Sequence, residues 1–250
     1  GIVNALNISP EDNLLEIGPG TGQLTEHLVK FETPLKVVEI DKEMIDLLEK
    51  KIPGIHIIQQ DILKADWDFF PGEKYKLVGN LPYYITTAIL EKIVEESDRL
   101  QLAVVMTQYE VGKRIMAEPG SKEYGRLSLF INNYFEVRFI KKVSGRMFYP
   151  PAKVSSMVMA FIPREKTLVP KEFNEIFFHL VKGVFSQRRK NIMNCLKSYP
   201  YFFPLKNQLN SLLEMAGIDW KRRGETLNFN EFNKLCEIIN EEFKRINREA

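Results

Sequence analysis

The sequence predicts an α/β fold, with a doubly wound, mostly parallel sheet, an antiparallel edge hairpin, and a small all-helical domain after the sheet. Three observations support this prediction. Short apolar runs alternate with helical stretches over the first 106 residues, two strand-like runs follow, and the periodic segments after Pro163 have helical spacing. Strands that alternate with amphipathic helices form βαβ units, whose strands are parallel.

Five apolar, β-branched runs give the expected parallel strands, since such runs are typical of strands buried on both faces of a sheet. They lie at 13–17, 35–40, 55–59, 75–79 and 102–106. Residues 22–31 and 42–52 have apolar side chains every three or four positions, which predicts helices. Asp41 stands where the second of these helices needs an N-cap. The β-branched and aromatic runs 134–143 and 155–163 predict an antiparallel hairpin that closes the sheet.

The chain changes character near residue 163. Residues 1–163 carry 19 Lys and Arg against 22 Asp and Glu, whereas residues 164–250 carry 16 against 11. Helical periods recur in this second part, which also contains the breaks SYPYFFP and GIDWKRRGETL. We therefore expect a first domain at 1–163 and a basic, all-helical domain at 164–250. On charge alone, a lysine-rich solvated surface explains the step equally well.

Composition excludes several classes of protein. Hydrophobic residues make up 44% and charged residues 27% of the chain, as in an ordinary globular protein. No apolar run approaches the ~20 residues that a bilayer-spanning helix needs, so no membrane association is expected. Cys195, Cys236 and three scattered histidines lack the spacing of metal ligands, which favours incidental buried thiols, no metal, and a reducing cytoplasm. A monomer is the default expectation.

A glycine-rich loop, EIGPGTG, follows the first expected strand and opens a helix. Its glycines, Gly18, Gly20 and Gly22, permit backbone angles that a β-carbon forbids and allow a ligand to approach the main chain. By itself such a loop can serve any nucleotide, or simply make a tight turn. The spacing GxGxG counts against a dinucleotide fold, for which GxGxxG is expected.

Polar side chains recur once per strand–helix unit, at Glu16, Glu39, Asp61 and Asn80. In an open parallel sheet all four belong at the carboxyl edge, where ligands bind. A carboxylate at Glu39 can accept hydrogen bonds from both ribose hydroxyls, and one at Asp61 from the exocyclic amine of an adenine. This lining suits an adenosine that bears a cationic sulfonium better than a diphosphate, so S-adenosylmethionine (SAM) is favoured over a dinucleotide and the sheet is predicted to be Rossmann-like. The predicted cofactor-binding residues are Glu16, Gly18, Gly20, Gly22, Glu39, Ile40, Asp61, Ile62 and Asn80.

Four motifs in this order and spacing, EIGPGTG, VVEID, QQDIL and NLPY, resemble those of the rRNA adenine-N6 dimethyltransferases. The resemblance continues through MTQYEVGKRI, EYGRLS, FYPPAKVSS, FSQRRKNIMN and RRGETLNFNEFNKL, and so covers essentially the whole chain. The N-[ILV]-P-[YF] signature is specific, because DNA amino-methyltransferases usually have Pro in its second place. The resemblance implies SAM-dependent dimethylation of the N6 amine of adenine.

The resemblance also implies roles at the NLPY motif. The Asn80 side-chain oxygen and the Leu81 carbonyl accept hydrogen bonds from the adenine amine, and Pro82 fixes the backbone beside them. Tyr83 stacks on the extruded base, a contact worth ~1–3 kcal/mol, and Phe148 flanks its other face. The structural alternatives are a loop aromatic for Tyr83 and a core residue for Phe148. No general base is needed, because the methylated amine is acidic enough to lose its proton to water.

Two basic clusters in the helical domain are the predicted RNA-binding residues. Arg188, Arg189 and Lys190 lie in the family motif FSQRRKN, where part of their role is expected to be structural; the second cluster is Lys221, Arg222 and Arg223. Such clusters contact phosphates without reading sequence. The alternative is a solvated helix face.

Three branches of the family compete. The KsgA/RsmA type dimethylates two adjacent adenosines in the 3′-terminal hairpin loop of 16S rRNA, within the immature 30S subunit; the macrolide-resistance type modifies 23S rRNA; mitochondrial relatives also act in transcription. The FSQRRKN segment and long helical tail resemble the first type. A SAM-binding ribosome assembly factor, in which catalysis is secondary, is a further alternative.

The sequence departs from the family pattern in two places. In FYPPAKVSS, Ala152 and Ser155 stand where the family usually has Pro and Asp. The family's basic leading segment, with a Gln-x-Phe-Leu-like motif, is not matched in these 250 residues, so we expect them to be less than fully active by themselves.

Overall fold

The computed structural model describes residues 1–148 and 150–249, and the chain forms two compact units. Unit 1 comprises Gly1–Gly112 and Phe135–Arg164; unit 2 comprises Lys113–Tyr134 and Glu165–Ala250. This division differs from a boundary at residue 163, because residues 113–134 contact the helical unit. Within that segment, Tyr124 and Leu129 belong to the hydrophobic core of unit 2, which a linear reading of charge and periodicity does not reveal.

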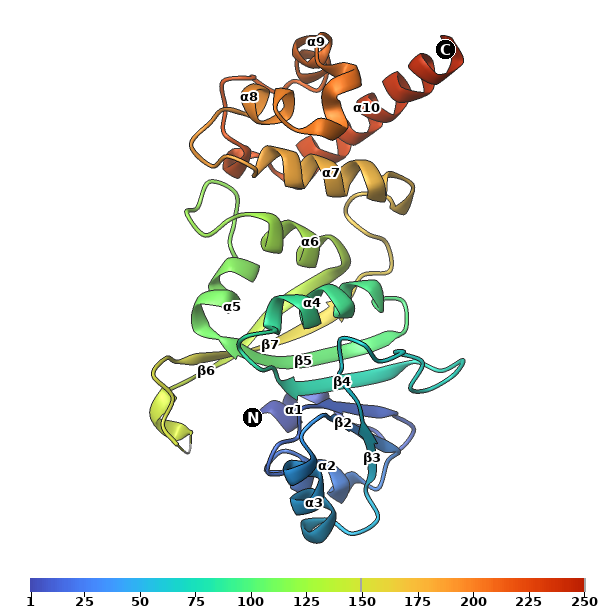
Figure 1. Ribbon diagram of the computed structural model, residues 1–250, viewed down its shortest axis with the longest axis vertical. Helices are drawn as coiled ribbons and strands as arrows, with labels where there is room; N and C mark the ends of the chain where they lie inside the picture. The colour runs from blue at the N-terminus through green and yellow to red at the C-terminus, as the bar shows by residue number, and fades with distance from the viewer. Residues whose placement is uncertain (149, 250) are drawn as a thin grey trace. The chain divides into compact units, whose positions relative to one another are not determined.

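Unit 1 is built on one seven-stranded sheet with the order β3-β2-β1-β4-β5-β7-β6 (Figure 1). The strands are β1 Leu14–Ile17, β2 Leu35–Glu39, β3 His56–Gln59, β4 Tyr75–Asn80, β5 Leu100–Gln108, β6 Phe135–Val143 and β7 Ser156–Pro163. Strands β1 to β5 pair in parallel, and β7 pairs antiparallel with both β5 and β6. The predicted fold class and the antiparallel edge hairpin are therefore confirmed.

The helices of unit 1 are short, and one of them, α3, has the N-cap that its sequence predicts. They are α1 Ile2–Leu6, α2 Thr25–Leu28, α3 Lys42–Lys51 and α4 Thr86–Glu95, with 3-10 turns at Val29–Phe31 and Gly145–Met147. The Asp41 carboxylate accepts hydrogen bonds from the backbone N–H groups of Glu43 and Met44 at the start of α3, which confirms the predicted N-cap. Leu6 of α1 packs with Leu14 and Val104 in a buried cluster on the sheet.

The strand order reverses between β1 and β4, and this reversal positions the site. From β1 the chain adds β2 and then β3 on one side, and it then returns to place β4 on the other side of β1. In open α/β sheets, ligands bind at the carboxyl ends of the strands at such a point. The two strands approach closely, since a β-carbon on Gly79 would lie 2.8 Å from the Ile17 carbonyl oxygen. Only glycine fits at that position of β4.

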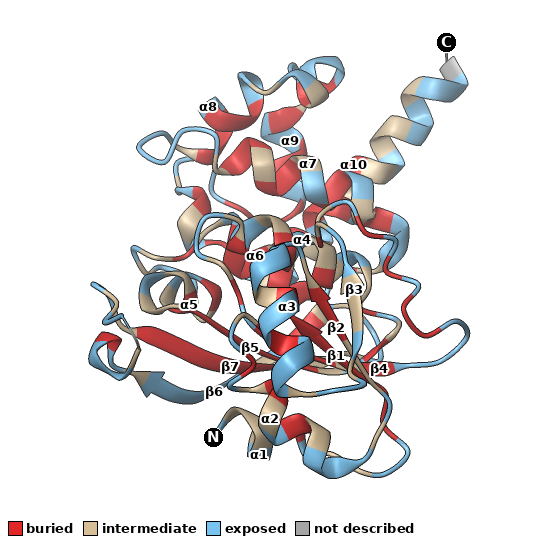
Figure 2. Cartoon of the chain, turned by 60° about the horizontal axis from the view of Figure 1, so that its bottom comes forward, coloured by how far each residue is buried: buried red, intermediate tan, exposed pale blue. Residues whose placement is uncertain are grey.

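Burial differs sharply between the two strands of the edge hairpin (Figure 2). Strand β7 is buried over most of its length, because it lies between β5 and β6. Strand β6 is at the sheet edge, and its residues from Arg138 to Lys142 are exposed. The edge strand thus offers side chains to solvent that the rest of the sheet does not.

Unit 2 consists of helices and turns. The helices are α6 Arg126–Tyr134, α7 Asn174–Val184, α8 Ile192–Lys197, α9 Leu209–Met215 and α10 Phe229–Glu249, with 3-10 turns at Lys171–Phe173, Pro200–Leu205 and Gly224–Thr226. Helix α5, Tyr109–Ile115, crosses the division between the units. The all-helical prediction is confirmed, but the helical period over residues 170–197 is interrupted by a turn between α7 and α8. Asn191 ends this turn by accepting a hydrogen bond from Asn194 N at 2.9 Å, so it caps α8.

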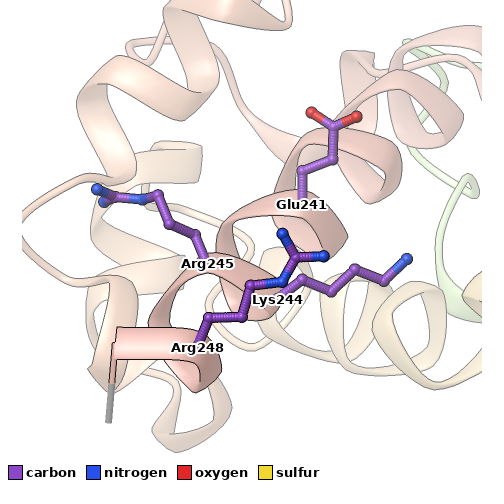
Figure 3. A pocket seen from close by; sticks show the side chains of 4 residues that line it. All are labelled: Glu241, Lys244, Arg245 and Arg248. Atoms are coloured by element: carbon purple, nitrogen blue, oxygen red, sulfur yellow. The ribbon is translucent and has the colours of Figure 1, made fainter.

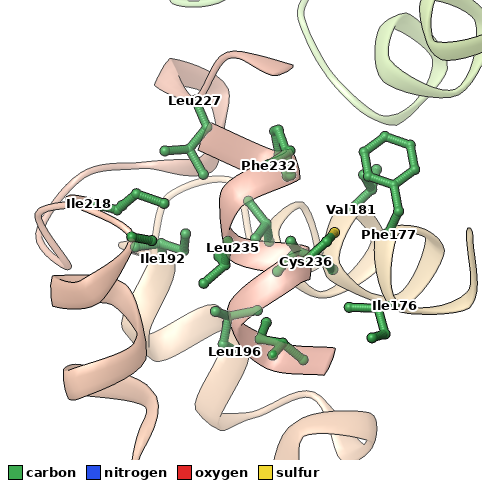
Figure 4. Close-up of a cluster of buried hydrophobic side chains, with 14 of the residues drawn as sticks. Ile176, Phe177, Val181, Ile192, Leu196, Ile218, Leu227, Phe232, Leu235 and Cys236 are labelled. Carbon is green, nitrogen blue, oxygen red and sulfur yellow. The ribbon is translucent and has the colours of Figure 1, made fainter. Parts of the chain in front are cut away.

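The core of unit 2 is one continuous cluster of buried aliphatic and aromatic side chains. Figure 4 shows Phe177 and Val181 of α7 beside Phe232 and Cys236 of α10. Phe177 meets Phe232 edge to face, with ring centroids 6.0 Å apart, a favourable aromatic geometry. Both cysteines are free and buried, as predicted.

No helix among the described residues has the length and apolarity to span a bilayer. Nor do three or more His, Cys, Asp or Glu side chains gather there in a way that could hold a metal ion.

Candidate functional site

The glycine-rich loop and the end of β2 are joined by a carboxylate. Glu39 Oε2 accepts a hydrogen bond from Gly20 N at 3.3 Å, and Glu39 Oε1 accepts from Ile40 N at 2.8 Å and Asp41 N at 3.0 Å. The three glycines of the loop, at 18, 20 and 22, all have positive φ. At Gly18 and Gly20 an added β-carbon would meet open space, with no heavy atom within 4 Å. The main chain there can therefore be approached by a ligand.

Glu16 is a buried carboxylate beside this loop. The residue is 1% exposed on β1, and its Oε2 has no hydrogen-bond partner in the described part of the chain. Burial raises the pKa of Glu16 to about 7; the Thr25 hydroxyl opposes this shift and the Glu39 carboxylate adds to it. A buried carboxyl without a partner is costly in a folded protein, so this oxygen is available to a cationic or hydrogen-bonding ligand.

Asp61 and two isoleucines complete this end of the edge. Asp61, just beyond β3, is half-buried, and its Oδ1 accepts a hydrogen bond from Leu63 N at 3.0 Å. This turn fixes the direction of the carboxylate. Ile40 is 60% exposed although it is large and apolar, whereas the neighbouring Ile62 is buried. Ile40 directly follows Glu39, whose carboxylate could accept hydrogen bonds from a ribose. Its exposed side chain is therefore suited to contact a flat apolar ring.

This edge of the sheet has the groups that SAM would need. Glu16 supplies a buried carboxylate oxygen without a hydrogen-bond partner among the described residues, and the main chain at Gly18 and Gly20 is open to a ligand. Glu39 supplies a second carboxylate, which backbone N–H groups hold in place. The set offers hydrogen-bond acceptors and negative charge, which match ribose hydroxyls and a cationic sulfonium and would repel a diphosphate. This set of acceptors therefore fits SAM.

Asn80 lies next to the glycine loop across the strand reversal. The register pairs Ile17 with Gly79, so Asn80 at the end of β4 is level with Gly18 at the end of β1. Asn80 is exposed, and its side-chain amide makes no hydrogen bond to another described residue. The structure therefore brings Gly18, Gly20, Glu39 and Asn80 to one edge, with the amide free to meet a substrate.

The residues after Asn80 are fixed by backbone hydrogen bonds. Leu81 N donates to Met106 O at 3.0 Å, which extends the pairing of β4 with β5 by one residue. The Pro82 carbonyl accepts from Thr86 Oγ1 at 2.8 Å and from Ile85 N at 3.2 Å at the start of α4. The Leu81–Pro82 peptide is thus held between a strand and a helix, which pre-organises the Leu81 carbonyl.

Two predicted aromatic residues differ in their surroundings. Tyr83 is 37% exposed, and its hydroxyl lies 3.0 Å from Ser156 Oγ at the start of β7. Phe148 is half-buried and packs against the sheet cluster that includes Met106 and Val158. Its contacts give it at least a packing role, and base stacking by Phe148 stays a prediction.

Residues that sequence reasoning missed lie close to these motifs. Ser156 orients Tyr83, Thr86 fixes the Pro82 carbonyl, and Tyr84 is 85% exposed directly after NLPY. Ser156 is the last residue of the motif FYPPAKVSS and Tyr84 directly follows NLPY, so their positions at the motif boundaries were the available signal. Nothing in the sequence distinguishes Thr86 from an ordinary residue of a helix N-terminus.

Arg188 of the first basic cluster is engaged within unit 2. Its Nη2 donates to the backbone carbonyls of Lys122 and Tyr124, the second at 3.1 Å, and it lies 3.8 Å from the Glu225 carboxylate. These contacts join the turn before α8 to the loop before α6. Arg189 and Lys190 are exposed. The structural component expected for this motif therefore falls on Arg188.

Arg222 of the second cluster anchors the start of α10. It donates to both oxygens of Glu231, with Nη2 to Oε2 at 3.1 Å, and to the Thr226 carbonyl at 2.7 Å. Glu231 in turn forms a capping box with Asn228. Burial alone raises the pKa of Glu231, but hydrogen bonds from Arg222 and from Asn228 N outweigh it and leave the pKa below its usual value.

We expect Arg222→Met to lower the free energy of unfolding by ~1–3 kcal/mol, because it leaves the partly buried Glu231 without its charged partner. Arg223→Met, at an exposed neighbour, should change it by less than ~0.5 kcal/mol. Denaturant unfolding monitored by circular dichroism measures both. Since the pKa of Glu231 is lowered in the folded state, the difference between wild type and Arg222→Met should shrink as pH falls through and below the ordinary glutamate range near 4.5. Equal effects of the two variants would contradict the anchoring role.

Further cations of unit 2 lie on α10. Lys244, Arg245 and Arg248 share one helix face with Glu241 and line a surface hollow (Figure 3). Arg245 pairs with Glu242 at 2.5 Å. With the exposed Arg189, Lys190, Lys221 and Arg223, they make unit 2 basic in the way that its composition predicts.

Comparisons with known proteins agree over the length of the chain. The family described as ribosomal RNA adenine dimethylase matches residues 1–241. Proteins named ribosomal RNA small subunit methyltransferase A, from Bacillus mycoides and Bacillus anthracis, are each 41% identical over 248 residues, covering 95% of this chain and 85% of theirs.

Solved structures show the same fold. A dimethyladenosine transferase from Plasmodium falciparum superposes with a TM-score of 0.80 at 24% identity, covering 97% of this chain and 94% of that one. The 23S rRNA methyltransferase ErmE superposes with a TM-score of 0.70 at 27% identity, covering 96% and 95%.

Proposed function

Because the chain belongs to the ribosomal RNA adenine dimethylase family, we propose that it transfers methyl groups from SAM to the N6 amine of adenosine in small-subunit rRNA. The substrate is two adjacent adenosines in the 3′-terminal hairpin loop of 16S rRNA, in an immature 30S subunit, and the enzyme acts as a monomer. The small-subunit assignment is supported by the 41% identity to proteins named small subunit methyltransferase A over 95% of the chain.

One observation carries the proposal. The glycine loop and Glu39 are joined at 3.3 Å, and Asn80 ends the strand that pairs with β1 directly beside that loop. A methyl donor and an adenine amine must approach within van der Waals contact for transfer. The strand reversal between β1 and β4 offers neighbouring positions for both.

The residues have distinct tasks in this proposal. SAM supplies an electrophilic methyl group on a sulfonium. Asn80 Oδ1 and the Leu81 carbonyl accept from the two N–H bonds of the adenine amine, which turns the nitrogen lone pair outward, and Tyr83 stacks on the base. Bound SAM would supply the methyl group to this nitrogen and leave as S-adenosylhomocysteine, and the cationic product would lose a proton to water. Alignment and proximity supply most of the acceleration.

Binding of SAM should depend on pH through Glu16. Because burial raises the pKa of Glu16 to about 7, the carboxyl is largely neutral at pH 6 and charged at pH 8, and a cationic ligand favours the charged form. We expect SAM affinity to rise about tenfold from pH 6 to pH 8 and then level, in isothermal titration calorimetry. Glu16→Gln should bind SAM with little pH dependence. A wild-type affinity that is flat over this range would contradict the role of Glu16.

The same raised pKa fixes the sign of a stability effect. Between pH 4.5 and about 7 the folded protein holds a proton on Glu16 that the unfolded chain releases. The stability contributed by this group therefore falls as pH rises through that window. SAM binding should offset the fall, since it favours the carboxylate.

The proposed function is tested by supplying methyl-labelled SAM together with undermethylated small subunits, large subunits or naked 16S rRNA. Label on small subunits, with reverse-transcription stops at two adjacent adenosines, is the expected result. Label confined to large subunits would replace the proposal with 23S rRNA methylation. No label on any of them, with intact SAM binding, would overturn it.

A further inference from the structure

A strongly basic arm lies at the sheet edge of unit 1. We define the arm as the described residues 137–148 and 150–155, which include most of β6 and its connection to β7. It carries Arg138, Lys141, Lys142, Arg146 and Lys153 and contains no Asp or Glu. All five cations are exposed, and Figure 1 shows the β6–β7 connection projecting beyond the end of the sheet.

Exposed apolar side chains alternate with these cations. Phe139 is 50% exposed, Met147 is 72% exposed and Val154 is 44% exposed. Cations interleaved with exposed aromatic and apolar groups are the composition of a nucleic-acid surface, where the cations contact phosphates and the flat or apolar groups contact bases and sugars.

The β6–β7 connection within the arm leaves the sheet beside the candidate methyl-transfer site. Val143 and Gln108 both pair with Ser156, so the arm leaves the sheet at the carboxyl end of β5. Ser156 Oγ is 3.0 Å from the Tyr83 hydroxyl. Phe148 is itself part of the connection. Phosphates that flank an adenosine at Asn80 would therefore come within reach of the arm.

Protection of a sheet edge explains only part of this charge. Lysines and bulges on an edge strand prevent pairing with another chain, and β6 has both, since its register shifts between Phe139 and Lys141. Arg146 and Lys153, however, lie in the connection outside the paired strand. No strand edge exists there to protect, so their charge needs another explanation.

We propose that this arm binds the phosphate backbone of the RNA next to the target adenosine. The inference rests on the proposed function, because it takes the substrate to be RNA. It means that unit 1 binds the nucleotides on either side of the target adenosine. The cations act by releasing condensed counterions from the RNA, whereas the choice of base is made at the NLPY motif.

The test uses a variant of three arm cations, Lys141→Gln, Arg146→Gln and Lys153→Gln. Arg138 and Lys142 are left unchanged, because their charged groups contact Glu136 at 2.7 Å and the Tyr109 ring at 4.4 Å. The matched control removes the same charge from unit 1 with Lys30→Gln, Lys50→Gln and Lys74→Gln, at three exposed positions. Binding of a 16S rRNA 3′-terminal hairpin is measured by fluorescence anisotropy at several salt concentrations.

We expect the arm variant to bind this RNA about tenfold to a hundredfold more weakly, with a salt slope reduced by about 2. The control should stay within about threefold of wild type, and SAM affinity should be unchanged in both. Equal affinities and slopes for the two variants would overturn the inference. So would an arm variant that loses affinity for ribosomal particles but not for the hairpin, which would indicate a protein partner.

The readout does not depend on methyl transfer. If the wild-type protein binds RNA through the arm but labels no adenosine, the proposed function fails and the arm assignment stands. If it methylates 16S rRNA and the arm variant binds as the control does, the reverse holds.

Discussion

Asn80→Ala is expected to lose methyl transfer by at least about a thousandfold while keeping the SAM affinity of the wild type. The amide is exposed and without a hydrogen bond to another described residue, so its removal leaves no buried group unpaired. Loss of one pre-organised polar group that acts on the reacting centre costs about 10²–10³ in rate. Loss of lone-pair alignment at a weakly nucleophilic amine adds to that cost. Single-turnover transfer from labelled SAM, together with calorimetry for SAM, measures the two quantities separately.

A matched control for this variant is Asn4→Ala in α1, which removes an amide of the same kind from another part of unit 1. It should retain the transfer rate within a small factor. If Asn80→Ala still methylates at a comparable rate, Asn80 does not act on the amine. If it loses SAM affinity in the same proportion as rate, Asn80 binds the donor instead.

Glu39→Ala is expected to weaken SAM binding about a hundredfold. The carboxylate organises the loop through Gly20 N and is proposed to accept the ribose hydroxyls, and hydrogen bonds to a charged group are worth ~1.5–3 kcal/mol each. At the lower end of that range, two such bonds correspond to about two orders of magnitude in the dissociation constant. Calorimetric titration with SAM and with S-adenosylhomocysteine should show the same loss for both, because they share the ribose.

Asp41→Ala provides the comparison two residues away. Asp41 caps α3 through Glu43 N at 2.9 Å, so its loss should cost ~1 kcal/mol of stability with little change in SAM affinity. A Glu39→Ala protein that binds SAM as tightly as Asp41→Ala would show that Glu39 only shapes the loop.

Much of this fold is predictable from the sequence because its signals are local. The parallel strands are short β-branched runs with polar residues recurring at or near their carboxyl ends, and the Asp41 cap is predicted from one residue and the helix after it. The spacing of Glu16, Glu39 and Asn80 places them at one edge for the same reason. These features depend on the side-chain periods of strands (about 2 residues) and helices (about 3.6 residues) and on the direction of each strand. All of these can be inferred from the order of residues in the chain.

What could not be predicted depends on contacts distant in sequence. Residues 113–134 join unit 2 because Tyr124 and Leu129 pack into its core, and no local signal marks that choice. The bonds of Arg222 to Glu231 and of Tyr83 to Ser156 likewise join separate segments. A run of arginines reads as one basic cluster, and only the fold separates Arg222, which anchors a helix, from the exposed Arg223.

Insertion of β7 between β5 and β6 has a consequence for synthesis of the chain on the ribosome. All the proposed SAM contacts lie within the first 80 residues, yet 47 residues separate the end of β5 from the start of β7. Until β7 emerges, one edge of β5 lacks its final neighbour, and unpaired strand edges are prone to mispairing. A nascent chain that stops before residue 156 would therefore contain the proposed SAM-binding residues but not Ser156, the partner of the Tyr83 hydroxyl. We expect such a chain to depend on chaperones and to be catalytically inactive.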